Sequence, residues 1–177
     1  MLIANNISKS FAGVQALSSV HLSLQPGMVH AIIGENGAGK STLMKILSGV
    51  IHNYEGQILL NDKPVQFNST RDAEAAGIAM IHQELNLVPQ LSVVENIFLG
   101  REITDSFGML AERVMYEASL DLLKRVGLSV DPCTKIETLK VGQQQLVEIA
   151  KALHTKASII IMDEPTSALS DTEIATL

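Results

Sequence analysis

The sequence has little of several residue types, and each shortage excludes a class of protein. Of its 177 residues, only 3% are aromatic and none is tryptophan. Its single cysteine, Cys133, follows Asp131-Pro132 in an expected loop, which excludes an internal disulfide and fits a reducing compartment. No apolar stretch approaches the roughly 20 residues that cross a bilayer, and the run Ile159 to Met162 is far too short. The sequence therefore predicts neither a disulfide-stabilised secreted domain nor a membrane-spanning protein.

Positive charge is also scarce. Thirteen basic residues stand against nineteen acidic ones, the net charge is −6, and no basic cluster is longer than Lys124-Arg125. Proteins that bind nucleic acids usually carry a visible positive surface, so no nucleic-acid partner is expected. The segment Met1 to Asn6 lacks the basic and apolar regions of a secretory signal, which predicts that the domain stays in the cytosol.

What is present indicates a soluble α/β protein with one well-packed domain over residues 1–177, since 46% of the residues are hydrophobic and 18% are charged. Short apolar runs bounded by turn residues predict strands. These runs are Leu2–Ala4, Val20–Leu24, Val29–Ile33, Gln57–Leu60, Ile78–His82 and Ala157–Met162. Three consecutive isoleucines in the last run are typical of a parallel strand that is buried on both faces.

The middle of the chain, from about residue 90 to 150, is predicted to be a helical subdomain. Ser92 and Glu95 form a capping box that opens a helix to about Leu99. Apolar residues at three- and four-residue steps predict an amphipathic helix over Glu112–Val126, and another helix is expected over Gln143–Leu153. Earlier in the chain, a helix is expected from Thr42 to about Leu47, and a short one begins near Ser69.

A glycine-rich loop carries the first chemical signal. Its sequence, Gly34-Glu35-Asn36-Gly37-Ala38-Gly39-Lys40-Ser41-Thr42, fits the phosphate-loop pattern G-x-x-x-x-G-K-[ST] at every fixed position. A strand before it and a helix after it would aim backbone N–H groups at a triphosphate, at the positive end of the helix. Lys40 is expected to reach the β- and γ-phosphates, and the Ser41 hydroxyl is expected to bind Mg²⁺.

An acidic pair supplies the second signal. Asp163 and Glu164 directly follow the strand that ends at Met162. At that place Asp163 can hold Mg²⁺ through water, and Glu164 can polarise the water that attacks the γ-phosphate. The alternative for such a pair is an ordinary polar loop, which the complete phosphate loop upstream disfavours.

A third motif precedes the acidic strand by about 20 residues and opens a helix: Leu139-Lys140-Val141-Gly142-Gln143. With this motif in this order, the chain resembles the ATP-binding cassette (ABC) ATPases, whose signature is L-S-G-G-Q. Leu139, Gly142 and Gln143 match that signature. The resemblance implies a phosphate-loop NTPase cassette with a mainly parallel core sheet, an N-terminal antiparallel β part and the helical subdomain, and it implies ATP and Mg²⁺ as cofactors.

The same resemblance assigns roles to further residues. Gln83 looks like the glutamine that contacts Mg²⁺ and couples the site to a membrane partner, and Phe11 looks like the aromatic residue that stacks on adenine. Ser167-Ala168-Leu169 resembles the loop that crosses the dimer interface. Lys140, Gly142 and Gln143 would contact, in trans, the ATP that is held by a second cassette. For Phe11 the alternative is a simple core aromatic.

Within the family, the chain is most similar to importers of ribose and other monosaccharides. The likeness lies in Ile81–Leu91, in Glu95–Glu102 and in the run from Gly142 to Lys151. It implies an ATPase that lies on the cytoplasmic face of the inner membrane and powers membrane permease subunits, which receive sugar from a periplasmic binding protein. ATPase polypeptides of that subfamily carry two cassettes in tandem, and this chain would be most of the first.

Two departures from the family pattern affect these expectations. Lys140 stands where the family has the serine that touches the opposite γ-phosphate, and an ammonium is a longer and less directional donor. All five histidines precede the acidic strand, so the histidine that senses the γ-phosphate in the family is not among these residues. A second capping box, Ser170 to Glu173, announces a helix that Leu177 cuts short, which predicts a piece of a longer protein.

Two other functions remain open from the sequence. One is a soluble ABC-type ATPase that acts on ribosomes or DNA, for which a basic insertion or tail is the expected sign. The other is a fragment that binds nucleotide weakly and hydrolyses almost none.

Overall fold

The computed structural model describes residues 1–82 and 84–163, and the chain divides into two compact units, Met1–Ile78 and Ala79–Leu177. Three predicted functional parts fall outside the described residues: Gln83, Glu164 and the segment 167–173. No described helix is both long and apolar enough to cross a membrane. The expectation of a single domain stays a prediction.

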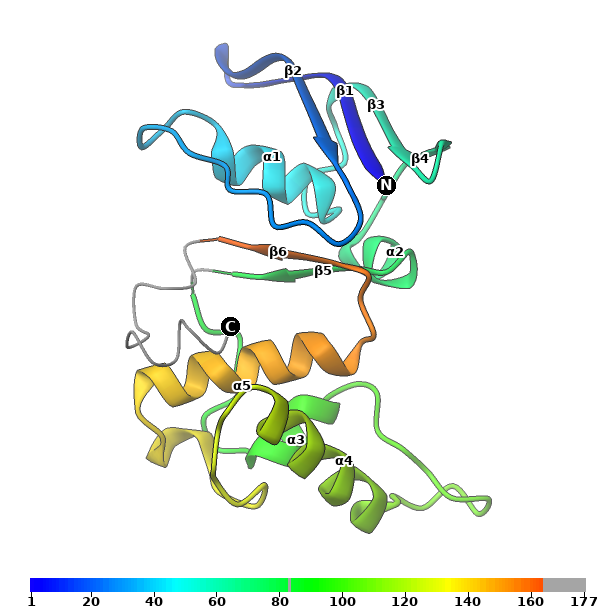
Figure 1. Cartoon of the computed structure of the whole chain (residues 1–177), viewed down its shortest axis with the longest axis vertical. Coiled ribbons are helices and arrows are strands. Elements are labelled where there is room, and N and C mark those ends of the chain that lie inside the picture. The colour runs from blue at the N-terminus through cyan, green and yellow to red at the C-terminus, as the bar shows by residue number, and fades with distance from the viewer. Residues whose placement is uncertain (83, 164–177) are drawn as a thin grey trace. The chain divides into compact units, whose positions relative to one another are not determined.

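The first unit is built on a four-stranded antiparallel sheet with the order β2-β1-β3-β4 (Figure 1). Its strands are β1 (Leu2–Phe11), β2 (Val14–Leu24), β3 (Glu55–Leu60) and β4 (Lys63–Val65). Along β1, Leu2 and Ala4 are fully buried, and a register shift between Ala4 and Ile7 keeps Ile7 on the same buried face. The bulge therefore continues the core past a point where strict alternation would have turned it to solvent.

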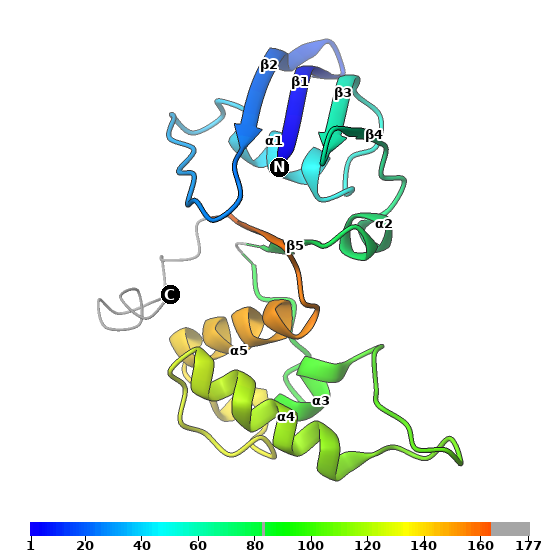
Figure 2. The ribbon, with the colours of Figure 1, turned by 45° about the vertical axis from the view of Figure 1, so that its right-hand side comes forward.

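Two helices accompany this sheet: α1 (Lys40–Leu47) and α2 (Thr70–Ala75). Figures 1 and 2 show α1 lying across one face of the sheet. Leu43, Ile46 and Leu47 are its buried residues, spaced as one face of a helix requires. The Ser69 side chain caps α2 by accepting a hydrogen bond from the Asp72 N–H, as its sequence predicts.

The predicted strand Val29–Ile33 is wrong: these residues have no regular secondary structure here. Val29 is 99% exposed and Ile33 is 92% exposed. A strand exists only when a neighbour accepts its backbone hydrogen bonds, and no described strand pairs with this segment. The segment is apolar, but it lacks the pairing with a neighbouring strand that would make it a strand.

The described part of the second unit has a two-stranded parallel sheet and a helical layer. Its elements are β5 (Ile78–Ile81), α3 (Val93–Phe98), α4 (Glu112–Arg125), the 3-10 turn η1 (Ile136–Thr138), α5 (Val141–His154) and β6 (Ile159–Met162). Figure 1 shows β5 and β6 running in the same direction, which confirms the predicted parallel strand. The expected burial on both faces is wrong for β6, because only Ile161 is buried and the other three residues are partly exposed. Each predicted helix of this region is present within two residues of its expected ends.

A single hydrophobic core joins α3, α4 and α5. Its largest fully buried members are Phe98, Ile81, Ile97, Leu123, Ile136 and Val93. The capping box predicted at the start of α3 is complete. Ser92 Oγ accepts a hydrogen bond from the Glu95 N–H, and the Glu95 carboxylate accepts one from the Ser92 N–H at 2.7 Å. These helices hold the signature motif at the first turn of α5.

Candidate functional site

The phosphate loop leads directly into α1, as its sequence predicts, although the strand expected before it is not formed. Lys40 is the first residue of α1, and its Nζ donates to the Gly34 carbonyl at 2.8 Å and to the Glu35 carbonyl at 2.9 Å. The Ala38 N–H donates to the Glu35 carbonyl at 3.1 Å, which closes the loop into a turn. The ammonium is thus folded back into the concavity of the loop, where a phosphate would need it.

Two glycines make this turn possible. Gly37 and Gly39 have φ angles of 83° and 91°, a region that residues with a Cβ avoid. Gly39 also lacks room, because a Cβ there would lie 2.5 Å from the Ala16 carbonyl oxygen and 2.8 Å from Leu17 Cδ2. The third loop glycine, Gly34, has neither constraint.

The start of α1 fits an anion. No acidic residue lies in the first turn of α1, and no side chain caps it, within the helix as described. The positive end of its dipole therefore favours a negatively charged ligand. Ser41 and Thr42 follow Lys40 in this turn and are partly buried. The residues fit a triphosphate, and the hydroxyl of Ser41 and the carboxylate of Asp163 are hard oxygen donors of the kind that Mg²⁺ binds.

Phe11 ends β1 in the same unit and is largely exposed, which does not fit the simple core alternative. The Lys9 ammonium lies 5.1 Å from the centre of its ring. Phe11 is in the β1–β2 hairpin, whose second strand also carries Ala16 and Leu17 beside Gly39. The hairpin end thus brings the predicted adenine-stacking ring and the phosphate loop into one unit.

Asp163 lies in the second unit, directly after β6. It is buried, and its N–H donates to the Ile81 carbonyl at the end of β5 at 3.1 Å. Parallel strands place the residues after their carboxyl ends at one edge of the sheet, which is where ligands bind in such folds. Two predicted neighbours of Asp163 in the site, Gln83 and Glu164, lie outside the described residues.

The signature motif forms the N-terminus of α5. Leu139 is buried, whereas Lys140 and Val141 are exposed. The Lys140 N–H donates to Gln143 Oε1 at 3.0 Å, which is half of a capping box; the other half needs an acceptor that an ammonium lacks. Lys140 and Gly142 are therefore at the open end of a helix, where they are available to a second molecule.

Sequence reasoning missed a polar cluster behind this helix. Asn96 on α3 is 0% exposed and Glu148 on α5 is 9% exposed, and both bind the backbone of the segment 86–88. Burial raises the pKa of Glu148, while Lys151, the Asn86 N–H and His82 act in the opposite direction. The available signal was polarity at core-facing positions: Asn96 is three residues after Val93, and Glu148 interrupts an apolar run.

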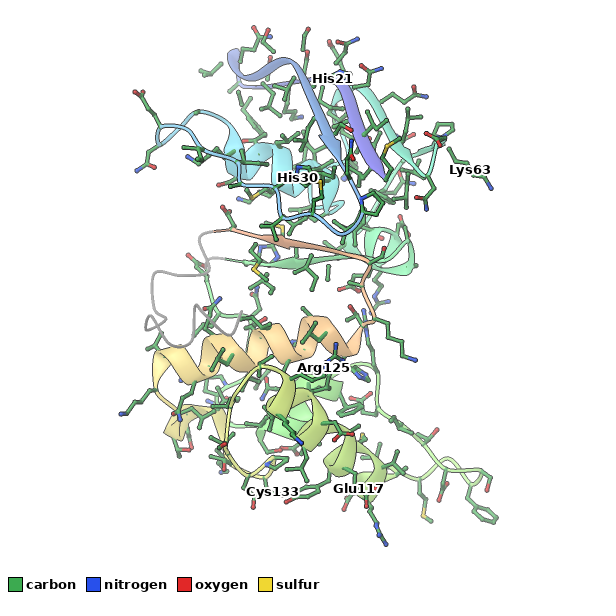
Figure 3. The ribbon with its side chains drawn as sticks, viewed as in Figure 1. His21, His30, Lys63, Glu117, Arg125 and Cys133 are labelled. Atoms are coloured by element: carbon green, nitrogen blue, oxygen red, sulfur yellow. The ribbon has the colours of Figure 1, made fainter. Side chains whose placement is uncertain are left out.

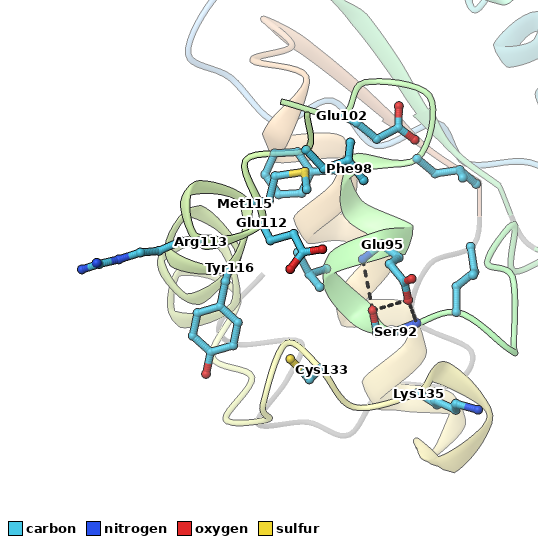
Figure 4. Close-up of a pocket in the computed structure, with 14 residues that line it drawn as sticks. Ser92, Glu95, Phe98, Glu102, Glu112, Arg113, Met115, Tyr116, Cys133 and Lys135 are labelled. Carbon is cyan, nitrogen blue, oxygen red and sulfur yellow. Dashed lines mark hydrogen bonds between the residues drawn. The ribbon is translucent and has the colours of Figure 1, made fainter. Parts of the chain in front are cut away.

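A cavity of about 760 Å³ lies beside α3 and α4 (Figure 4). Cys133 lines it from the loop before η1, and Figure 3 shows Cys133 in the same unit as Glu117 and Arg125. The other lining side chains are mainly apolar, with three glutamates among them: Leu91, Ser92, Val94, Glu95, Phe98, Leu99, Glu102, Leu110, Glu112, Arg113, Met115, Tyr116 and Lys135. Hydrogen bonds from Ser92 lower the pKa of Glu95, and backbone N–H groups lower the pKa of Glu102, so both carboxylates stay charged.

Comparisons with known proteins agree with these motifs. Residues 17–167 match the family model described as ABC transporter. A ribose import ATP-binding protein of Oceanobacillus iheyensis is 49% identical over 173 residues, which are 98% of this chain and 35% of that protein. A xylose import ATP-binding protein of Moorella thermoacetica is 52% identical over 179 residues, covering 100% of this chain and 35% of that protein. The chain thus spans about a third of the length of these relatives.

Solved structures agree as well. The dimeric, post-hydrolysis ATP-binding cassette MJ0796 bound to ADP and Pi matches with a TM-score of 0.84 at 27% identity, over 99% of this chain and 79% of that one. The ADP conformation of MJ1267, an ATP-binding cassette of an ABC transporter, has a TM-score of 0.84 at 29% identity, over 99% and 72%. These likenesses confirm the predicted cassette fold and, with the family match, show that the chain belongs to the ABC transporter family.

Proposed function

We propose that the chain is an ATP-binding and ATP-hydrolysing part of a monosaccharide importer, acting at the cytoplasmic face of the inner membrane. The observation that carries the proposal is the Lys40 ammonium held inside the loop Gly34–Thr42 at the start of α1. Relatives that are about half identical over nearly the whole chain are named as import ATP-binding proteins for ribose and xylose. The net charge of −6 gives no support to a ribosome- or DNA-directed ATPase.

In this proposal the residues of the loop bind and orient the triphosphate. Lys40 exchanges the carbonyls of Gly34 and Glu35 for oxygens of the β- and γ-phosphates, and Phe11 stacks on the adenine. Ser41, Gln83 and Asp163 would hold Mg²⁺, which supplies neutralisation of the phosphate charge. Glu164 accepts a proton from water as the water oxygen bonds to the γ-phosphorus, and the bond to the β–γ bridging oxygen breaks to release ADP and phosphate.

A second cassette completes each site in this proposal. Lys140, Gly142 and Gln143 lie at the open N-terminus of α5 and would contact the γ-phosphate of ATP held by that partner. The site on the loop Gly34–Thr42 would receive the equivalent motif in return. The related cassette MJ0796 is described as dimeric with ADP and Pi, which supports this arrangement.

The cavity beside α3 and α4 is the surface that we assign to a membrane permease. Leu99 and Leu110 are exposed apolar side chains that line it, and exposed apolar surface marks protein contacts. The charged Glu102 carboxylate on its wall favours a basic residue beside the apolar part of the partner segment. Sugar would reach the permease from a periplasmic binding protein.

The test of the function is transport by the full-length protein reconstituted with its permease in vesicles. Lys40→Ala should abolish ATP-dependent sugar uptake, whereas Lys45→Ala, an exposed lysine on the same helix, should keep it. Uptake that survives Lys40→Ala would refute the proposal.

The docking surface has its own test, because Cys133 is the single cysteine of the chain and lines the cavity. Desolvation and the nearby Asp131 raise the pKa of Cys133, so a maleimide should be used at alkaline pH. Permease binding should slow the labelling of Cys133. An unchanged labelling rate in the intact complex would place the permease elsewhere.

A further inference from the structure

The segment Asn86–Val88 is fixed by side chains from two helices: α3, which follows it closely in the sequence, and α5, which is far away in the sequence. The Asn86 N–H donates to Glu148 Oε1 on α5 at 2.7 Å, across 62 positions of sequence. Lys151, one turn later on α5, donates from Nζ to the Asn86 carbonyl at 3.4 Å. Both polar groups of the Asn86 peptide backbone are therefore bound by α5.

The other end of the segment is held by α3. Asn96 Oδ1 accepts the Val88 N–H at 2.7 Å, and Asn96 Nδ2 donates to the carbonyls of Val88 at 3.1 Å and Ser92 at 2.9 Å. Asn96 is fully buried, so its amide uses its acceptor and both donors inside the protein. A buried amide with this many bonds fixes the backbone it touches more firmly than an apolar residue of the same size would.

A backbone connection continues from this segment to the signature motif. The Glu137 N–H donates to the Pro89 carbonyl at 3.0 Å, and the Ile136 N–H donates to the Leu91 carbonyl at 3.1 Å. Gln144 Nε2 in turn donates to the carbonyls of Ile136 at 3.2 Å and Leu139 at 2.9 Å. Hydrogen bonds thus tie residues 89–91, just after this segment, to η1, and η1 to the start of α5.

We infer that Glu148 and Asn96 are positioning residues, which fasten the segment Asn86–Val88 to α5 and α3 so that this segment and the signature helix move as one body. The inference rests on the proposed function for its consequence. Asn86 comes shortly after Gln83, the glutamine that is predicted to couple the ATP site to the permease. A movement of α5, the helix that begins with the signature motif, would therefore move this segment as well. The buried Glu148 carboxylate carries the connection, since it makes the shorter of the two hydrogen bonds that join Asn86 to α5 within residues 1–82 and 84–163.

The experiment is amide hydrogen exchange on the full-length protein, with and without a non-hydrolysable ATP analogue. Glu148→Ala should speed exchange at the Asn86 amide by about 10- to 100-fold, the effect of losing a hydrogen bond to a charged group. Glu148→Gln keeps a side-chain oxygen acceptor and should restore protection to within about threefold. Glu117→Ala, on the neighbouring helix α4 with a side chain that is 62% exposed, should change nothing at Asn86 (Figure 3).

The unsubstituted protein tests the same inference if Glu148→Ala fails to fold. Its Asn86 and Val88 amides should be protected about as well as amides inside α5, and the analogue should change both regions together. Independent exchange of the two regions, or a failure of Glu148→Gln to rescue, would overturn the inference.

A kinetic measurement separates positioning from stability. Glu148→Ala should lower kcat for ATP in the assembled transporter by about tenfold or more and leave the ATP Kd of the phosphate loop unchanged, because that loop is in the first unit. Equal losses in kcat and in ATP affinity, with a lower urea midpoint for Glu148→Ala and for Glu148→Gln, would mean a merely structural role. That result would overturn the inference. If the unsubstituted protein hydrolyses no ATP, the proposed function fails. Hydrogen exchange at the Asn86 amide still tests whether Glu148 fastens the segment Asn86–Val88 to α5.

Discussion

Alanine substitutions at Gly39 and Gly37 separate two reasons why a loop position needs glycine: a left-handed backbone and a lack of space for a Cβ. Both glycines have left-handed backbones, with φ angles of 91° and 83°. A Cβ at Gly37 meets no atom within 4 Å, whereas a Cβ at Gly39 would lie 2.5 Å from the Ala16 carbonyl oxygen. The two substitutions therefore share the backbone penalty and differ only in the steric one.

The magnitudes follow from this geometry. Placing alanine in the left-handed region costs about 1 to 2 kcal/mol at either position. At Gly39 the backbone of β2 and the loop must also move apart, and forcing extra atoms into a packed site adds about 1 to 3 kcal/mol. Since about 1.4 kcal/mol is a factor of ten in an equilibrium constant, ATP should bind to Gly39→Ala about 5- to 150-fold more weakly than to Gly37→Ala.

The assay is a fluorescence titration of the full-length protein with a labelled ATP, accompanied by urea unfolding of each variant. Gly13→Ala is a further control, because Gly13 has a φ of 87° and open space around it but lies outside the loop. It should lower the stability by the same backbone penalty of about 1 to 2 kcal/mol and leave ATP binding unchanged. Equal ATP affinities for Gly37→Ala and Gly39→Ala would refute the argument that contact with Ala16 determines the shape of the loop.

Two further predictions concern the second unit. Hydrogen bonds from Ser92 lower the pKa of Glu95 from 4.5, so the carboxylate stabilises the fold above that pH, and the contribution is lost as the pH falls through the lowered value. Glu95→Gln should thus reduce the free energy of unfolding by about 0.5 kcal/mol at pH 7 and by less under acid, measured by urea titration at several pH values; a difference that grows in acid would contradict this reasoning. Ser119 Oγ is buried without a hydrogen-bond partner among the described residues, so Ser119→Ala should be neutral or stabilise the protein by about 1 kcal/mol. A loss of more than about 1 kcal/mol in the same titrations would mean that this hydroxyl is bound after all.

The helices were predictable because their signals are local. The capping box of Ser92 and Glu95, the Ser69 cap and the three- and four-residue spacing in Glu112–Val126 depend on neighbours within one or two turns. The predicted strand Val29–Ile33 was wrong, because a strand needs a backbone partner from another part of the chain and local composition does not show whether one exists. The polar contacts of Asn96 and Glu148 were missed for a similar reason, since Glu148 meets its backbone partner 62 positions away.

The sequence by itself determined the chemistry of this protein. The residues Gly34–Thr42, the acidic pair after the isoleucine strand and the motif Leu139–Gln143 predict a nucleotide cassette, because the groups expected to bind lie next to one another within each motif. Only the tertiary structure decided which glycine of the loop is sterically required and how the segment after His82 is tied to the signature helix. Those facts depend on atoms that sequence spacing cannot relate: the Ala16 carbonyl beside Gly39, and the Glu148 carboxylate on the Asn86 N–H.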